Sequence, residues 1–482
     1  MSSPVDATSN PGQAATPSPP AVPTRRNTEL LMLAFAAILV TIANVLVEAN
    51  QEQELSTQLL YNGAAFLALF GIAHLAVRKW APYADPLILP FAALLNGVGL
   101  IAIYRIDLAD AAADPDHGYL VNRQIGWMVI SVVLFVLILA FVKDHRLLAR
   151  FGYTCGFVGL IALALPGFLP ASMSSAGGAK IWIRIGGAGI QPGEFAKILL
   201  MIFFASFLVS KRDLFTVAGR RFLGMDFPRM RDMAPMLLAW AASVGVLVFE
   251  RDLGTSLLFF GLVLVMIYVA TERVSWVVIG LSLFAIGCVI AYPLFNHLRV
   301  RVLNWMDPLG RLDATDGDSF QLVQSLFGLG TGGIFGTGLG SGRPTLIPAA
   351  ETDFIISAIG EEIGFVGVAA VLLLYLLLVM RGLRTALAVR DSFGKLLASG
   401  LAFIIGLQVF IVVGGATRLI PSTGITAPFL SYGGSSLLAN YILVALLLLI
   451  SHAARKPQPP SKPRPQQAPL AEAHTEMVAR PT

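Results

Sequence analysis

Apolar runs recur along almost the whole chain, and they decide what it can fold into. Of the 482 residues, 56% are hydrophobic and 13% are charged, whereas a soluble domain carries about a quarter charged residues. Each run is close to the roughly 17–25 residues that a membrane-spanning helix needs. The sequence therefore predicts an all-α, polytopic integral membrane protein with about twelve transmembrane helices. We place them near residues 29–48, 57–77, 86–103, 125–142, 152–170, 193–210, 235–250, 254–271, 275–294, 354–379, 396–414 and 430–451.

The distribution of basic residues indicates how these helices are oriented in the cell membrane. If the N-terminus lies in the cytoplasm, most of the 34 Lys and Arg residues fall in cytoplasmic segments, although the longest loop, residues 295–353, lies outside. This bias matches the positive-inside rule and predicts that both termini are cytoplasmic. Residues 1–28 and 452–482 are rich in Pro and in small or polar residues, so we expect them to be disordered tails.

Two segments within the apolar region do not read as continuous helices. Residues 171–193 are rich in Gly and carry Lys180 and Arg184 among apolar residues, and residues 415–433 contain several Pro and Gly. Irregular backbone at membrane depth is tolerated only where protein buries it or water reaches it. We therefore expect both discontinuous segments to line a cavity that opens to the outer face.

The carboxylate of Asp353 stands where the polar, Gly-rich end of the long loop meets a very apolar run. Asp353 is followed by Phe354, Ile355 and Ile356. A buried and unpaired carboxylate at the mouth of a membrane helix is costly, which makes it a candidate functional residue. A helix cap is the alternative, because Thr352 and Asp353 are both good capping types. The residues alone leave both interpretations open.

The glycines on either side of Asp353 suggest close packing. Residues 328–333 match G-x-G-x-x-G, but no strand precedes them, so they predict neither a dinucleotide site nor a nucleotide cofactor. We expect a pliable loop that packs closely on a substrate or partner. Gly360 and Gly364 form a G-x-x-x-G pattern, which is typical of tight helix–helix contacts.

Three further charged residues stand at the starts of two other apolar runs. Glu194 and Lys197 are three residues apart, so a helix places both on one face. They are either a neutralising structural pair or support for a cavity and a polar head group. Asp252 precedes Gly254 and Thr255, and a helix cap is again the alternative to a functional role.

Several cations are expected near the outer face. A groove with such residues suits a ligand that carries pyrophosphate, because the planar arginine fork matches phosphate oxygens. Some will instead be interfacial residues whose long side chains reach for water. The cations are Lys180, Arg184, Arg251, Arg299, Arg301, Arg343 and Arg418.

Five stretches together resemble the SEDS family of cell-wall glycosyltransferases, which includes RodA and FtsW. The arrangement is most similar to that of the elongation-type RodA proteins of actinobacteria. The resemblance implies a ten-helix glycosyltransferase core at residues 86–451, preceded by two additional transmembrane helices at residues 29–85. The stretches, in family order, are KIWIRIGGAGIQPGEFAKI, DLGTS, FQLVQSLFGLGTGGIFGTGLG, ETDFIISAIGEEIG and RLIPSTGITAPFLSYGGSSL.

The resemblance also implies an activity and a site. Family members polymerise lipid II, a disaccharide-pentapeptide on undecaprenyl pyrophosphate, into glycan strands at the outer face of the membrane. They work with a class B penicillin-binding protein. Asp353 matches the family's essential aspartate, and Glu194, Lys197 and Asp252 match other functionally important positions. Ser431, in the last stretch, joins these candidates.

This reaction needs a base for the acceptor hydroxyl and positive charge for the departing pyrophosphate. A divalent cation, Mg²⁺ or Mn²⁺, is a further expectation, with Asp353 as a candidate ligand. The chain departs from the family pattern at Glu351, Arg251 and Gly193, where His, Pro and Ser are usual. Because Glu351 replaces the usual His, the resemblance does not imply a helper role for a histidine at this position. The alternatives to an elongation-type polymerase are a flippase for lipid-linked precursors and a division-type polymerase like FtsW.

Overall fold

The computed structural model describes residues 24–457 with several gaps. Between residues 212 and 251 only scattered residues are described. Most of both predicted tails and part of the run at 235–250 therefore lie outside the described residues. The shorter gaps are residues 53–56, 115–117, 177–178, 186–187 and 315–318.

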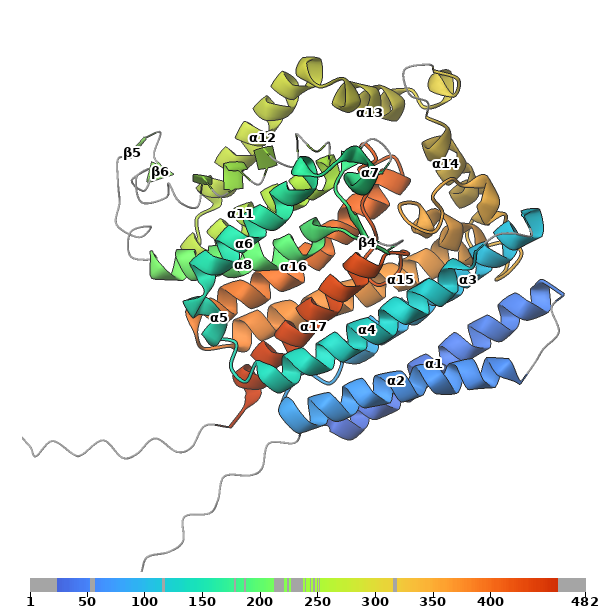
Figure 1. Cartoon of the computed structure of the whole chain (residues 1–482), viewed down its shortest axis with the longest axis horizontal. Coiled ribbons are helices and arrows are strands. Elements are labelled where there is room, and N and C mark those ends of the chain that lie inside the picture. The colour runs from blue at the N-terminus through green and yellow to red at the C-terminus, as the bar shows by residue number, and fades with distance from the viewer. Residues whose placement is uncertain are drawn as a thin grey trace, which may run out of the picture.

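Ten of the described helices are long and apolar enough to cross a membrane, and Figure 1 shows most of them running side by side in one bundle. The prediction of a helical, polytopic membrane protein is confirmed for these ten spans. An eleventh apolar helix, α6 (Gly152–Phe168), is shorter. The ten are α1 (Arg26–Asn50), α2 (Gln58–Trp80), α3 (Ile88–Ala113), α4 (Leu120–Phe141), α8 (Pro192–Ser210), α11 (Leu253–Thr271), α12 (Val274–Leu294), α15 (Ile355–Ala388), α16 (Ser392–Ala416) and α17 (Gly434–Arg455).

The centre of the bundle is formed by α16 and α17, most of whose residues are buried. Small residues let the helices approach, as is usual in membranes. A Cβ atom on Gly382 would lie 2.6 Å from the Cβ of Ala402, and one on Gly400 would lie 3.0 Å from the sulfur of Met201. By contrast, α12 has no buried residue and arches away from the bundle together with α13 (Asn296–Met306) (Figure 1).

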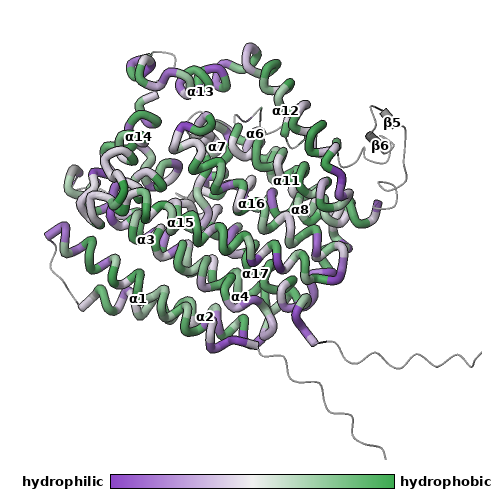
Figure 2. The backbone as a smooth tube through the Cα atoms, turned by 180° about the vertical axis from the view of Figure 1, so that it is seen from behind, coloured by the Kyte–Doolittle hydropathy of each residue, from purple (hydrophilic) through white to green (hydrophobic). Residues whose placement is uncertain are grey.

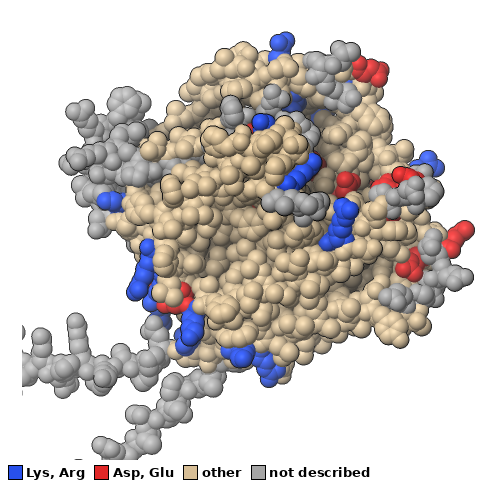
Figure 3. All heavy atoms as spheres, viewed as in Figure 1, with Lys and Arg blue, Asp and Glu red and all other residues tan. Residues whose placement is uncertain are grey.

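Apolar and charged residues separate along the bundle. Figure 2 shows apolar residues over much of the length of the helices, with more polar residues towards their ends. Figure 3 shows a broad surface without charged residues between groups of charged side chains. This pattern is expected of a membrane-embedded bundle whose charged side chains reach water at two interfaces.

The two additional N-terminal helices, α1 and α2, pack along α3 and α4 at one edge of the bundle (Figure 1). A buried ionic cluster fixes the start of α1. Arg26 pairs with Glu29 and donates to the carbonyl of Ala84, and Nδ1 of His74 lies 2.7 Å from Glu29 Oε1. The buried charges are thus paired, as burial requires.

The segment at 171–193 is not a continuous helix, as expected, but it contains strands that an all-α description omits. A short helix, α7 (Ala171–Ser174), is followed by two small antiparallel hairpins. In the second hairpin Ile183 pairs with Ile190. The strands are β1 (Ser175–Ala176), β2 (Ala179–Lys180), β3 (Ile183–Ile185) and β4 (Ala188–Ile190). Three other short elements are α5 (Leu147–Arg150), β5 (Arg221–Phe222) and β6 (Met225–Asp226).

The prediction of a pliable Gly-rich loop was wrong for residues 328–332, which form the last turn of α14 (Phe320–Gly332). A Cβ atom on Gly332 would lie 2.0 Å from the carbonyl oxygen of Gly360. Glycine is needed there because α14 packs against the backbone of α15, and this packing outweighs the poor helix propensity of Gly. The long loop also contains α13 and two 3₁₀ turns, η1 (Leu309–Arg311) and η2 (Pro344–Leu346).

Candidate active site

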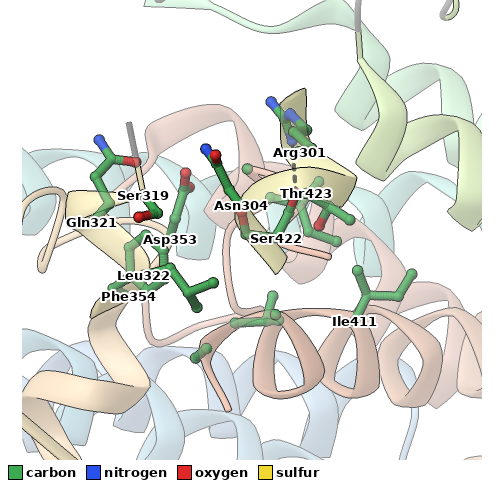
Figure 4. Close-up of a pocket in the computed structure, with 15 residues that line it drawn as sticks. Arg301, Asn304, Ser319, Gln321, Leu322, Asp353, Phe354, Ile411, Ser422 and Thr423 are labelled. Atoms are coloured by element: carbon green, nitrogen blue, oxygen red, sulfur yellow. Dashed lines mark hydrogen bonds between the residues drawn. The ribbon is translucent and has the colours of Figure 1, made fainter. Parts of the chain in front are cut away.

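Asp353 lies in a turn directly before α15 and does not cap that helix. The N-cap position is Phe354, and no side chain makes a capping hydrogen bond there. The amide of Phe354 donates instead to the carbonyl of Ala349, whose φ is +57°. This turn presents the Asp353 side chain to a cavity (Figure 4). The helix-cap alternative is therefore excluded by the local geometry.

The cavity holds about 190 Å³ and lies where three segments meet. One wall is α13, a second is the start of α14 with Asp353, and the third is the end of α16 with the irregular segment that follows it. Figure 4 shows Arg301 and Asn304 on α13 across from Asp353. Polar and apolar residues both line it, namely Arg301, Asn304, Ser319, Gln321, Leu322, Asp353, Phe354, Ile411, Val412, Gly415, Ala416, Ser422, Thr423, Gly424 and Ile425.

Arg301 is the cation that the structure brings to Asp353. Its Nη1 donates to the carbonyl of Ser422 at 2.9 Å, which fixes the guanidinium at the cavity wall. A Cβ atom on Gly424 would lie 3.5 Å from Asp353 Oδ2 and 3.8 Å from Arg301 Nη2. Because Gly424 has a φ of +76° and no side chain, the carboxylate and the guanidinium share an open space above it.

The surroundings of Asp353 suit a base. Burial raises the pKa of its carboxyl group to about 6, Glu351 and Asp252 act in the same direction, and Arg301 opposes them. At neutral pH the carboxylate is therefore mostly ionised, while its pKa remains close to the working pH. Efficient general bases have a pKa in this range.

Asp252 lies near this pair but has a structural partner. It is the N-cap of α11, where Oδ1 accepts from the amide of Thr255 at 2.9 Å. The cap interpretation is correct for this residue. Asp252 is buried and interacts electrostatically with Arg301 and Glu194. It therefore links the cavity to the Glu194–Lys197 pair.

Glu194 and Lys197 form an ion pair at the start of α8, with 2.6 Å between Oε2 and Nζ; Lys197 is buried and Glu194 is partly buried. Neither residue lines the cavity, so our expectation that they share it with Asp353 was wrong. Lys197 also donates to Gln408 at 3.2 Å, and Gln408 donates to the carbonyl of Thr426 at 2.8 Å. The pair thus supports the cavity wall from behind.

Ser431 fixes the backbone next to Asp353. Its Oγ accepts from the amide of Ala427 at 2.8 Å and donates to the carbonyl of Thr352 at 2.6 Å. The amide of Tyr432 donates to the carbonyl of Glu351 at 2.7 Å. The irregular segment at 415–433 therefore holds the turn that carries Asp353.

Of the other predicted cations, Arg251 lies outside the described residues, and the remaining five do not line the cavity. Arg418 is exposed and donates to the carbonyls of Trp305 and Met306, which tie the end of α13 to the irregular segment. Arg343 and Arg184 are exposed, and Lys180 is half-buried in the first hairpin. Sequence reasoning missed several polar residues of the cavity. Gln321, Ser422 and Thr423 lie within the family-like stretches, which was their only signal, whereas Asn304 and Ser319 lie outside those stretches and carried none.

Among the residues that the structure describes, no group of three or more His, Cys, Asp or Glu side chains could hold a metal ion. The cavity offers one carboxylate, that of Asp353. It would suit a hard cation only if substrate phosphates and water supplied most of the ligands, as is common for Mg²⁺.

Comparison with known proteins places this arrangement in a family. Residues 85–456 match the cell cycle protein family of FtsW, RodA and SpoVE. Peptidoglycan glycosyltransferase RodA of Mycobacterium tuberculosis is 56% identical over 468 residues, which cover 97% of this chain and 99% of that protein. Stage V sporulation protein E of Bacillus subtilis is 35% identical and covers 79% of this chain and 100% of that protein.

Two solved structures share the fold. A chain of a peptidoglycan synthase complex superposes with a TM-score of 0.61 at 30% identity, covering 78% of this chain and 99% of that chain. The Thermus thermophilus rod shape determining protein RodA superposes with a TM-score of 0.54 at 28% identity, covering 78% and 98%. With its cavity, its Asp353 and these matches, the chain belongs to the FtsW/RodA/SpoVE family of cell cycle proteins, the SEDS family.

Proposed function

We propose that this chain polymerises lipid II into glycan strands at the outer face of the cytoplasmic membrane. It is a peptidoglycan glycosyltransferase of the RodA type, which acts in cell elongation, as its similarity to RodA over almost its whole length indicates. The single observation that carries the mechanism is the placement of Asp353 and Arg301 on one open space. A base and a cation are the two groups that this glycosyl transfer needs.

In the proposed reaction a sugar hydroxyl of one lipid-linked substrate attacks the anomeric carbon of the other. The new carbon–oxygen bond forms as the bond from that carbon to the undecaprenyl pyrophosphate breaks. Asp353 accepts the hydroxyl proton, and the bond electrons leave with the pyrophosphate. Arg301 faces the same space and would neutralise the charge that develops on the leaving group.

A divalent cation, Mg²⁺ or Mn²⁺, belongs to the same proposal. In this alternative to the role of base, Asp353 would be its protein ligand, with pyrophosphate oxygens and water as the others. When bound, it would supply further positive charge for the leaving group. Arg301 would supply part of this positive charge by itself, since the carbonyl of Ser422 fixes its guanidinium at the cavity wall.

The proposed topology has twelve spans, both termini in the cytoplasm and the cavity outside. Its support is the charge bias of the sequence together with the ten spans that the structure describes. Ser341 is exposed in the loop before Asp353. A cysteine placed at Ser341 in intact cells should react with a membrane-impermeant thiol reagent, while one at Ser461 should not. The reverse labelling would overturn the orientation.

The proposed partner is a membrane-anchored class B penicillin-binding protein. The support is the similarity to a chain from a complex described as coordinating polymerization and crosslinking. The test is a polymerisation assay with purified full-length chain and lipid II, with and without the partner. We expect glycan strands, a higher rate with the partner, and a stoichiometric complex on co-purification. Absence of strands in both reactions would contradict the activity, and full-rate synthesis without any complex would contradict the partner.

A further inference from the structure

The end of α1 makes a specific contact with the loop at residues 338–343, which precedes Asp353 in the chain. The side-chain amide of Asn50 donates to the carbonyl of Leu339, and that of Gln51 donates to the carbonyl of Gly340. A Cβ atom on Gly340 would lie 3.0 Å from the Cβ of Asn50 and 3.1 Å from the carbonyl oxygen of Val47. The loop backbone is therefore pressed directly against α1, and two side chains of α1 hold it there.

The other side of this loop is held by α15. The amide of Gly340 donates to Glu362 Oε2 at 3.1 Å, and the amide of Arg343 donates to Glu361 Oε1 at 3.0 Å. Arg105 of α3 completes the contact, since its Nε lies 3.0 Å from Glu362 Oε1 and its Nη2 lies 2.7 Å from the carbonyl of Gly342. The loop is thus a layer between α1 and the two buried glutamates of α15.

The glutamates lie next to a break in α15. Gly364 has non-helical angles, with φ of 65° and ψ of −172°. Residues 333–338 replace the missing helical hydrogen bonds: the amides of Thr337 and Gly338 donate to the carbonyls of Glu361 and Glu362 at 2.9 and 3.0 Å. The short first part of α15, residues 355–363, therefore depends on residues 333–343 for its position. It begins two residues after Asp353.

We propose that Asn50 and Gln51 are positioning residues for glycosyl transfer. Through them the N-terminal helix pair, α1 and α2, braces the loop at 338–343 and the short first part of α15, and so fixes the place of Asp353. The pair lies outside residues 85–456, which match the family. This inference rests on the proposed function, because its effect on catalysis needs Asp353 to take part in the reaction.

The first test measures whether Asn50 and Gln51 hold the loop at 338–343 in place, and it does not measure activity. Two double variants of the full-length chain would be compared in lipid nanodiscs: Asn50→Ala with Gln51→Ala, and the isosteric Asn50→Asp with Gln51→Glu. The isosteric pair keeps the side-chain shape and replaces the donors by acceptors. The matched control is Glu52→Gln, which changes the next residue, an exposed one. The readout is amide hydrogen exchange in residues 336–343, followed by mass spectrometry.

Both double variants should exchange about tenfold faster at the amides of Gly340 and Arg343, because each lost hydrogen bond contributes a modest net stability and opening of the loop exposes these amides. The Glu52→Gln variant should match the wild type. Unchanged exchange in the isosteric variant would overturn the proposal. That variant remains informative even if the alanine variant fails to fold.

The second test measures lipid II polymerisation by the same proteins with the partner present. The double variants should lose about tenfold in kcat with little change in KM, since a displaced base slows the chemical step more than binding. Their thermal midpoints should stay near that of the wild type. Faster exchange with unchanged kcat would overturn the positioning role. If the wild type makes no strands while the double variants still exchange faster in the loop, the proposed function is overturned. The contact of Asn50 and Gln51 with the loop at 338–343 would then still stand.

Discussion

Replacing Arg301 by Gln should lower lipid II polymerisation by about 10²-fold, the typical cost of losing one group that stabilises developing charge. Arg301 shares the open space above Gly424 with Asp353, and its other nitrogen is fixed by the carbonyl of Ser422. In the proposed mechanism it faces the departing pyrophosphate. Gln keeps a hydrogen-bond donor but removes the charge, so the loss reports the electrostatic contribution.

The same substitution should also shift the pH dependence of the rate. Asp353 accepts a proton only when it is ionised, so the wild-type rate should rise with pH through the pKa of Asp353, which is about 6. Arg301 lowers that pKa against the effect of burial. Its removal raises the pKa, and the acid limb of the profile should move to higher pH. The measurement is the initial rate of strand formation from acidic to mildly alkaline pH.

Two variants control this experiment. Arg299→Gln makes the same change of charge on α13, but Arg299 is exposed and does not line the cavity, so its rate and pH profile should match the wild type. Arg301→Lys keeps the charge, so its acid limb should stay near pH 6. A near-normal rate and an unshifted acid limb in Arg301→Gln would contradict the role given to Arg301.

The membrane spans could be predicted because length and hydropathy are local properties. A run such as residues 396–414 has few alternatives to a spanning helix, and α16 confirms it. Arg301 could not be singled out in the same way. It is one of seven cations of similar character, and only the path of α13 across the irregular segment brings it, and not Arg343 or Arg418, to Asp353.

The errors have a common cause in tertiary contacts. Residues 328–332 looked pliable because Gly disfavours helices, yet α14 needs those glycines to approach the backbone of Gly360. The break at Gly364 was hidden within an apolar run, because the residues that replace its hydrogen bonds, 333–338, lie earlier in the chain. Glu194 and Lys197 were expected at the cavity, but Gln408 stands between them and its wall.

Asp353→Asn should abolish polymerisation, with a loss of at least the ~10²-fold typical of removing a general base. The amide fills nearly the same space but cannot accept the proton of the acceptor hydroxyl. No helix cap is lost, because Asp353 does not cap α15. We therefore expect normal expression, a normal thermal midpoint and normal binding of the partner.

The most direct test of the account compares wild type and Asp353→Asn, each purified with the partner, in one lipid II polymerisation assay at neutral pH. Binding of lipid II is measured in parallel, so that a loss of rate is not confused with a loss of substrate. The account predicts that the variant binds lipid II as the wild type does and forms essentially no glycan strands. Strand formation at a near-normal rate by Asp353→Asn would contradict the claim that Asp353 is the base.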